Sequence, residues 1–179
     1  MSAKGMWICY ENTSRGTPLK TLTQSHIDEM LTRYYLPHHQ ALTSLTEQEL
    51  ARQKRALIVD CHSFSSTPLP YEEDQTVPRA DFCLGTDDMH TPPALIQACK
   101  AFLTAQGYHV TVNKPYRGTM VPVAYLNKNS RVHSIMIEVN RKLYCNESDG
   151  SMLPAFQKIK HHLFLLLQLL EQSDFSSSL

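Results

Sequence analysis

An acidic residue and a histidine follow an apolar run in the first half of this sequence. Asp60, Cys61 and His62 come directly after residues 56–59, which are all apolar. In an extended strand, Asp60 and His62 share one face and Cys61 points to the other, so Cys61 and His62 are not expected to form a nucleophile–base pair. A carboxylate can orient or supplement an imidazole that binds a metal. Asp60 and His62 therefore predict a metal site, and a histidine hydrogen-bonded within a loop is the alternative.

A single carboxylate interrupts a second apolar run near the end of the chain. Glu138 lies within residues 135–139, which are otherwise apolar. An unpaired buried carboxylate is costly, so it must find a cation, a hydrogen-bond donor or a metal. A structural ion pair, with Arg141 as a partner beyond a turn, is one interpretation. A general acid or base with a pKa shifted by its surroundings is the other.

Further candidate residues lie in a loop and near a helix end. Residues 113–122 combine turn formers with cations, and they include Asn113 and Arg117. Loops of this kind often close over substrates, although most only connect elements. His38 and His39 follow a proline; they are candidate metal ligands, but histidines near a helix end also interact favourably with the helix dipole.

The composition predicts one globular domain over residues 1–179. Of the 179 residues, 42% are hydrophobic and 19% are charged, which is enough apolar material for one core. The 17 Lys and Arg residues balance 17 Asp and Glu residues, and the pI is about 7.1. This balance argues against a broad basic surface, so neither a nucleic-acid partner nor a membrane partner is expected.

Cysteine usage and the lack of long apolar segments predict a location. The five cysteines are scattered and form no CxxC pair, so no disulfide framework or zinc ribbon is indicated. Residues 1–16 hold no apolar core of the length that an export signal needs. The longest apolar run, residues 163–167, is far shorter than the roughly 20 residues of a membrane span. A reduced, cytoplasmic protein is the expectation.

The first half of the chain predicts helices followed by a buried strand. Apolar residues at helical spacing indicate a helix from Thr21, which Pro37 should kink or end. Thr46 and Glu49 form a possible capping box for a short polar helix that runs through Lys54. The continuous apolar run at residues 56–59 is typical of a strand buried on both faces, and residues 63–78 indicate a long loop.

The second half continues the alternation of strands and helices. A helix is expected from Thr91, as the N-cap, to a stop at Gly107. Strands are expected at residues 108–112 and 133–139, and a last helix at residues 153–171. Such alternation predicts an α/β layered sheet, mostly parallel and flanked by helices. Ligands of such sheets bind beyond the carboxyl ends of the strands, where Asp60, His62 and Glu138 are placed.

Four blocks of sequence resemble a known family. The blocks are LIVDCHSFS, PRADFCLGTD, VNKPYRGTMVP and IMIEVNRKLY, preceded by GTPLKTL and RYYLPHHQAL. In this order and spacing they resemble the N-formylglutamate amidohydrolases over about residues 16–144. The resemblance implies a fold similar to the zinc carboxypeptidases and phosphorylase/hydrolase-like proteins. It also implies metal-dependent hydrolysis of an N-formyl or other N-acyl amino acid, with release of formate in the namesake case.

The resemblance implies roles for particular residues. His62 matches a zinc ligand, and Glu138 matches the carboxylate that activates the metal-bound water and passes its proton to the leaving amine. Arg141, Asn113 and Arg117 match groups that bind the substrate's carboxylates.

The resemblance also implies a difference from the family. Family members carry a further N-terminal block with the first two metal ligands, and this chain is expected to begin after it. Asp60, His38, His39 or His133 would then have to complete a zinc site, which commonly has three protein ligands. The expected function is amide hydrolysis, and a non-catalytic remnant with a binding role is the alternative. A sheet edge or apolar patch uncovered in this way also predicts a homo-oligomer, and the C-terminal helix packed over part of that surface is the alternative.

Overall fold

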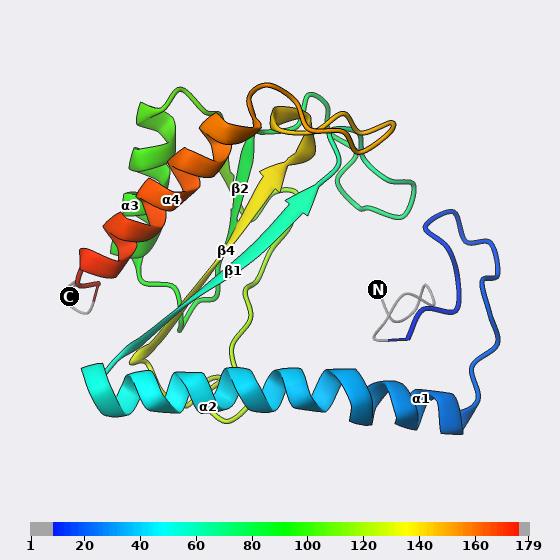
Figure 1. Ribbon diagram of the computed structural model, residues 1–179. Helices are drawn as coiled ribbons and strands as arrows, with labels where there is room; N and C mark the ends of the chain where they lie inside the picture. The colour runs from blue at the N-terminus through cyan, green and yellow to red at the C-terminus, as the bar shows by residue number, and fades with distance from the viewer. Residues whose placement is uncertain (1–8, 176–179) are drawn as a thin grey trace.

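A four-stranded mixed sheet forms the centre of the molecule. The computed structural model describes residues 9–175, and its strands lie in the order β1 (Ala56–Phe64), β4 (Val132–Asn140), β2 (Phe82–Gly85) and β3 (Val110–Val112). β1 pairs with β4 and β2 with β3 in parallel, whereas β4 and β2 are antiparallel. Two of the three pairings are parallel, which confirms the α/β, mostly parallel prediction (Figure 1).

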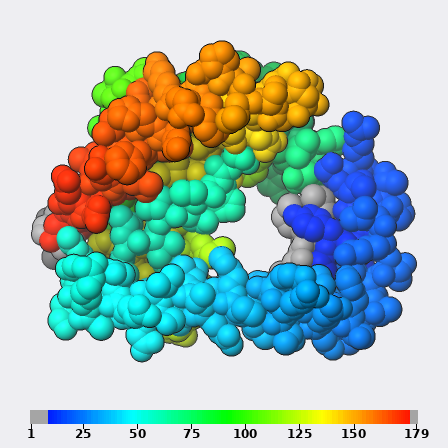
Figure 2. Space-filling view, in the orientation of Figure 1, coloured from blue at the N-terminus to red at the C-terminus, as the bar shows by residue number. Residues whose placement is uncertain are grey.

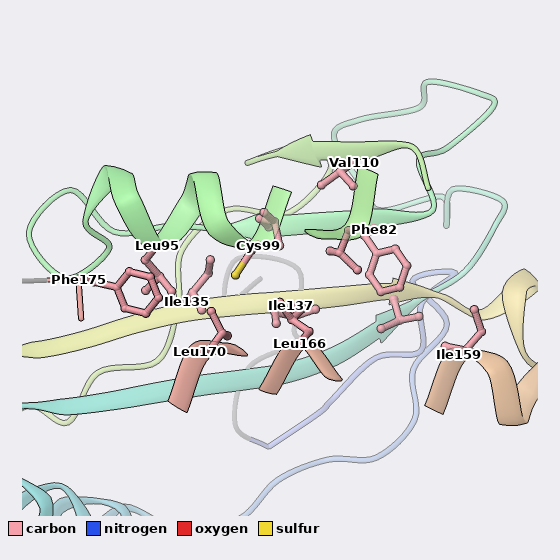
Figure 3. Close-up of a cluster of buried hydrophobic side chains, with 13 residues drawn as sticks. Phe82, Leu95, Cys99, Val110, Ile135, Ile137, Ile159, Leu166, Leu170 and Phe175 are labelled. Carbon is pink, nitrogen blue, oxygen red and sulfur yellow. The ribbon is translucent and has the colours of Figure 1, made fainter. Parts of the chain in front are cut away.

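Two helices cover one face of this sheet and enclose the core. They are α3 (Pro93–Ala105) and α4 (Phe156–Gln172). Ile135, Ile137 and Val139 alternate along β4 and pack with buried side chains of both helices (Figure 3). The residues between them, which include Ser134 and Glu138, fit a second covered face, so β4 is buried along its whole length.

The opposite face of the sheet lies under the loop of residues 113–122. The Ser134 hydroxyl donates to the carbonyl of Met120 over 2.7 Å, which fastens this loop to β4. At Gly85, at the end of β2, a Cβ atom would overlap the carbonyl oxygen of Gly118. The close approach of loop and strand therefore needs a glycine at this position.

Strand β1 differs from its prediction. Ala56 is buried, but residues 57–59 are only partly buried, although a strand buried on both faces was expected there. The strand also extends beyond residues 56–59 to Phe64, and residues 61–63 are exposed. Within residues 9–175, β1 pairs with β4 alone, so it is an edge strand. An edge strand lacks neighbours on one side, which explains its partial exposure despite its apolar sequence.

Of the two outcomes expected at Pro37, a kink or an end of the helix, the end is wrong, because the chain stays helical through this residue. α1 (Gln24–Met30) continues through a π-helical turn, η2 (Leu31–Tyr35), into α2 (Leu36–Gln53). The Leu36 N–H bonds to the Leu31 carbonyl, five residues back. Proline has no N–H and crowds the preceding turn, and a wider turn accommodates both effects.

This long helix lies along the edge of the molecule with little burial. Thr46 is the buried residue of α2, and α1 has none. The predicted cap at Thr46 is wrong, since its hydroxyl bonds to the Leu42 carbonyl within the helix. The end of the helix near Lys54 is confirmed, with Lys54 at φ 63°. Figure 2 shows an opening between this helix and the sheet along part of its length.

The predicted stop of α3 at its C-terminal end is confirmed, whereas the predicted N-cap is wrong. Gly107 follows the helix at φ 86°, the left-handed conformation that a glycine stop permits. Thr91 does not cap the helix: its hydroxyl accepts from the Asp87 N–H and donates to the Ser134 carbonyl at 2.6 Å. No helix of the part of the chain that the structure describes is long and apolar enough to cross a membrane.

Candidate active site

Two parallel strands bring three chemical groups to one end of the sheet. In the pairing of β1 with β4, His62 stands opposite Glu138, and Asp60 lies two residues before His62. Residues in register on neighbouring parallel strands share a face, so Asp60, His62 and Glu138 are on the same side of the sheet. The structure therefore brings together the carboxylates and the histidine that the sequence placed after two separate apolar runs.

Asp60 holds the imidazole of His62. The His62 Nε2 lies 2.8 Å from Asp60 Oδ1, and Asp60 Oδ2 accepts the Met120 N–H at 3.2 Å. The loop thus fixes the carboxylate, and the carboxylate fixes the ring. With Nε2–H donating to Asp60, the neutral tautomer leaves Nδ1 as a free acceptor. The His62 side chain is 48% exposed, so solvent or a ligand can reach it.

Glu138 is the buried carboxylate of this site. Only 6% of the residue is exposed, and its Oε2 has no hydrogen-bond partner. Burial raises the pKa of Glu138 above its ordinary value, and the charge of Asp60 adds to this, whereas His62 opposes it. A carboxyl group with a raised pKa and a vacant oxygen is suited to accept and return a proton.

The structural ion pair between Glu138 and Arg141 is not formed. Arg141 begins η3 (Arg141–Leu143) at the end of β4. Its Nε lies 3.5 Å from the Glu147 carboxylate, and its Nη1 donates to the Ser63 carbonyl at 3.3 Å. The charge of Arg141 still lowers the pKa of Glu138 from nearby. Of the residues matched to substrate binding, Arg141 is the one beside Glu138.

The other two residues matched to substrate binding are engaged elsewhere. Asn113 has φ 56°, accepts the Thr86 N–H at 3.0 Å, and donates to the Thr86 hydroxyl at 2.8 Å. Its amide therefore holds the start of the loop against the end of β2. Arg117 is exposed, and its guanidinium lies 3.9 Å from Asp88. A substrate could bind the Asn113 side chain only in competition with Thr86. Among the residues that the structure describes, the Arg117 guanidinium has no buried partner that a substrate would have to displace.

Most alternatives for completing a metal site do not join His62. His133 stands opposite Leu57, at the other end of β4 and on the opposite face from Glu138. His38 and His39 lie on α2, where the His39 ring packs against Tyr35. Within residues 9–175, no group of three or more His, Cys, Asp or Glu side chains is arranged to hold a metal. Asp60, the remaining candidate, contacts His62 directly.

A buried polar network that no sequence pattern indicated lies beside this site. Arg79 forms an ion pair with Glu72, and the two side chains are 2% and 4% exposed. The Tyr116 hydroxyl also donates to Glu72, at 2.8 Å. The sequence predicts a loop over residues 63–78 and indicates no role for it. Arg79 lies three residues before β2, and its closeness to a buried strand was the available signal, since charged residues are rarely buried unless paired.

Comparisons with known proteins bear on the family and the fold of the chain. The family model of N-formylglutamate amidohydrolase matches residues 1–145. The crystal structure of N-formylglutamate amidohydrolase from Ralstonia eutropha JMP134 is similar, with a TM-score of 0.74 and 30% identity, over 85% of this chain and 57% of that one. The gene product Atu2144 from Agrobacterium tumefaciens shares the fold, with a TM-score of 0.53 and 15% identity, over 88% of this chain and 63% of that one. No curated protein matches. The chain spans less than two thirds of either solved structure.

Proposed function

The chain belongs to the N-formylglutamate amidohydrolase family, and on that premise we propose that it hydrolyses the amide of an N-formyl amino acid such as N-formylglutamate. The products would be formate and the free amino acid, and the partner is a small molecule. The observation that carries the proposal is the unpartnered Oε2 of buried Glu138, opposite His62 on the neighbouring strand. The five free cysteines suit a reduced, cytoplasmic setting, which is part of the proposal.

Glu138 is the proposed general base and acid. Its pKa is raised toward neutral pH. A carboxyl group of this kind can take a proton from water and return it to the leaving amine. An amide needs this second step, because an unprotonated amine nitrogen is a poor leaving group. Arg141, beside Glu138, is the proposed partner for a carboxylate of the substrate, since a guanidinium matches a carboxylate in two parallel hydrogen bonds.

His62 is the proposed zinc ligand of this chain. The residues fit that role in part: the imidazole is oriented by Asp60 and has Nδ1 free, which is the arrangement of many metal-binding histidines. The described residues supply one such imidazole and not a group of three ligands. When bound, zinc lowers the pKa of a coordinated water and polarises a carbonyl group.

Zinc binding tests the role of His62 without any measurement of turnover. By isothermal titration, we expect His62→Ala to abolish zinc binding at the site, and Asp60→Asn to weaken it by about 10–100-fold. His161→Ala, an exposed histidine of α4, is the matched control and should bind zinc like the wild type. Equal affinities for the wild type and His62→Ala would contradict the assignment.

Formate release from N-formylglutamate tests the proposed reaction. In the presence of zinc, we expect Glu138→Gln to lower turnover by about 10²–10⁴-fold, because the amide cannot carry the proton. Glu47→Gln, on the exposed side of α2, should leave turnover unchanged. Absence of formate release by the wild type, or unchanged turnover in Glu138→Gln, would contradict the proposal for this chain.

A further inference from the structure

We propose that Arg79 is a positioning residue, which clamps the two loops beside the Asp60–His62–Glu138 site and so holds the end of β1 in place. The inference rests on the proposed function only in calling that site active. It concerns how the site keeps its shape, and it is carried by the buried contacts of a single guanidinium group.

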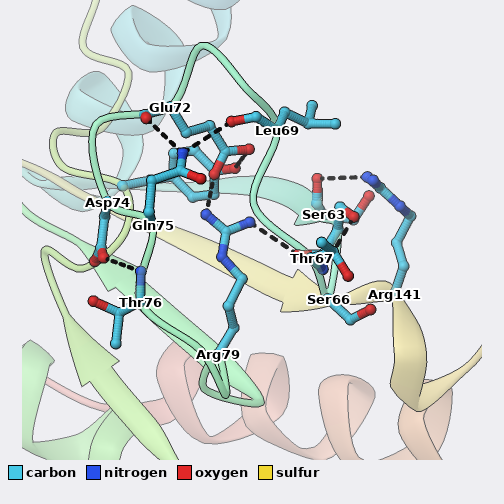
Figure 4. A network of polar contacts seen from close by, with 12 residues as sticks. Ser63, Ser66, Thr67, Leu69, Glu72, Asp74, Gln75, Thr76, Arg79 and Arg141 are labelled. Atoms are coloured by element: carbon cyan, nitrogen blue, oxygen red, sulfur yellow. Dashed lines mark hydrogen bonds and ion pairs between the residues drawn. The ribbon is translucent and has the colours of Figure 1, made fainter.

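The guanidinium of Arg79 touches three separate segments. It forms the ion pair with Glu72 in the loop of residues 65–81, and Nη1 donates to the Ser65 carbonyl at 2.9 Å, directly after β1. Its central carbon lies 5.4 Å from the centre of the Phe64 ring, and 5.6 Å from that of Tyr116 in the other loop. Figure 4 shows Arg79 reaching from the start of β2 toward Glu72 and toward the residues after β1.

Phe64 and Tyr116, the two aromatic partners of Arg79, each lie next to an element that carries a residue of the site. Phe64 lies two residues after His62, on the same face of β1. The backbone carbonyl of Tyr116 accepts the Cys83 thiol at 3.3 Å, and Cys83 stands opposite Glu138 across β2 and β4. Movement of Arg79 would therefore release both the strand that carries His62 and the loop packed beside Glu138.

The end of the loop that holds Arg79 is tied to the same strand as Glu138. The Asn140 side chain donates to the Ala80 carbonyl at 2.9 Å, and the Asn140 N–H donates to the Asp81 carbonyl. Asn140 is fully buried and lies two residues after Glu138. The Arg79 backbone is thus anchored to β4, while its side chain reaches β1 and both loops.

Stability alone is a weak reason for this ion pair. Removing two charges from water costs about as much as their attraction returns, so apolar residues of similar volume often replace a buried pair without loss of stability. The planar guanidinium, in contrast, fixes several partners in definite directions, which a flexible ammonium group does not. The contacts of Arg79 thus favour a role in placing segments.

The test compares loop opening with the position of His62 in the full chain. Glu72→Met/Arg79→Met replaces the pair with apolar residues, and we expect a thermal midpoint close to that of the wild type. We expect amide exchange in residues 65–79 and 113–122 to be about tenfold faster, as the loops open more often. The His62 ring signal in the NMR spectrum should shift. Glu49→Met/Arg52→Met, an exposed ion pair of α2, is the control and should change neither readout.

Milder variants cover the case in which the double variant does not fold. Arg79→Lys keeps the charge but loses the planar guanidinium with its several donors. Tyr116→Phe removes only the hydrogen bond to Glu72. Both variants should loosen the loops and shift the His62 signal, to a smaller extent than the double variant does. Unchanged exchange, or faster exchange with an unmoved His62 signal, would overturn the inference. If these readouts change while the wild type releases no formate, the proposed function fails and the role of Arg79 stands.

Discussion

At the scale of single residues, Glu138 combines burial with an unpartnered oxygen. Its raised pKa means that the folded chain holds the proton of this carboxyl group more tightly than the unfolded chain does. The unfolded state therefore binds fewer protons between the two pKa values, and stability falls as pH rises through that window. Such a cost is kept where the group has a chemical task, because selection for stability alone would remove it.

Glu138→Gln should remove this pH dependence. Above the window, we expect the variant to be more stable than the metal-free wild type, because glutamine is neutral and avoids the cost of burying the charge of Glu138. Urea unfolding between pH 4 and 8, with a chelator present, measures the difference. Glu47→Gln should follow the wild-type curve, and a Glu138→Gln curve parallel to that of the wild type would show that Glu138 titrates as an ordinary carboxyl.

At the scale of elements, the helix from α1 to α2 contains a turn that the sequence imposes on it. The π-helical turn η2 lies just before Pro37, where the missing N–H would otherwise interrupt a regular helix. Because this helix buries little, its local stability depends on its own backbone hydrogen bonds rather than on packing.

Pro37→Ala should convert this turn to a regular α-helix. The new N–H can bond to the Arg33 carbonyl, and proline is about 3 kcal/mol less favourable than alanine in a helix interior, so part of this difference should be regained. We expect slower amide exchange in residues 31–41 by mass spectrometry, with unchanged exchange in β4. Exchange in residues 31–41 that stays as fast as in the wild type would show that tertiary contacts, and not Pro37, cause the π-turn.

At the scale of the whole molecule, apolar surface remains open beside the free edge of β1. A groove of about 590 Å³ lies between β1 and α4, lined by Cys61, Val139 and Leu163 among others. Phe164 and Leu167 of α4 lie beside it and are 56% and 42% exposed. Large contiguous apolar surface next to a strand edge favours association, so the homo-oligomer stays a prediction.

Phe164→Glu should shift the chain toward monomer. A charge in an apolar contact is costly to bury, so we expect a lower mass at high protein concentration, measured by size exclusion with light scattering. Gln168→Glu adds the same charge at an exposed position of the same helix and should leave the mass unchanged. A wild-type chain that is monomeric at all concentrations would refute self-association through this surface.

The sequence by itself determined what depends on neighbouring residues. Alternation placed Asp60 and His62 on one face of a strand, helical spacing located α3 and α4, and Gly107 marked a helix end. These features follow from backbone geometry over a few residues. Thr91 was misjudged because its hydroxyl finds a better partner in a distant strand, at the Ser134 carbonyl.

Only the tertiary structure decided what depends on residues far apart in the chain. The pairing of His62 with Glu138, the edge position of β1, and the burial of Arg79 against Glu72 and Tyr116 all result from strand order and loop packing. Local pattern carries no information on which strands become neighbours, because register is set by side chains that meet only after the sheet has formed. The sequence thus named the candidate residues and predicted that they lie at the same edge of the sheet, whereas the strand pairing that joins them, and the clamp beside them, required the fold.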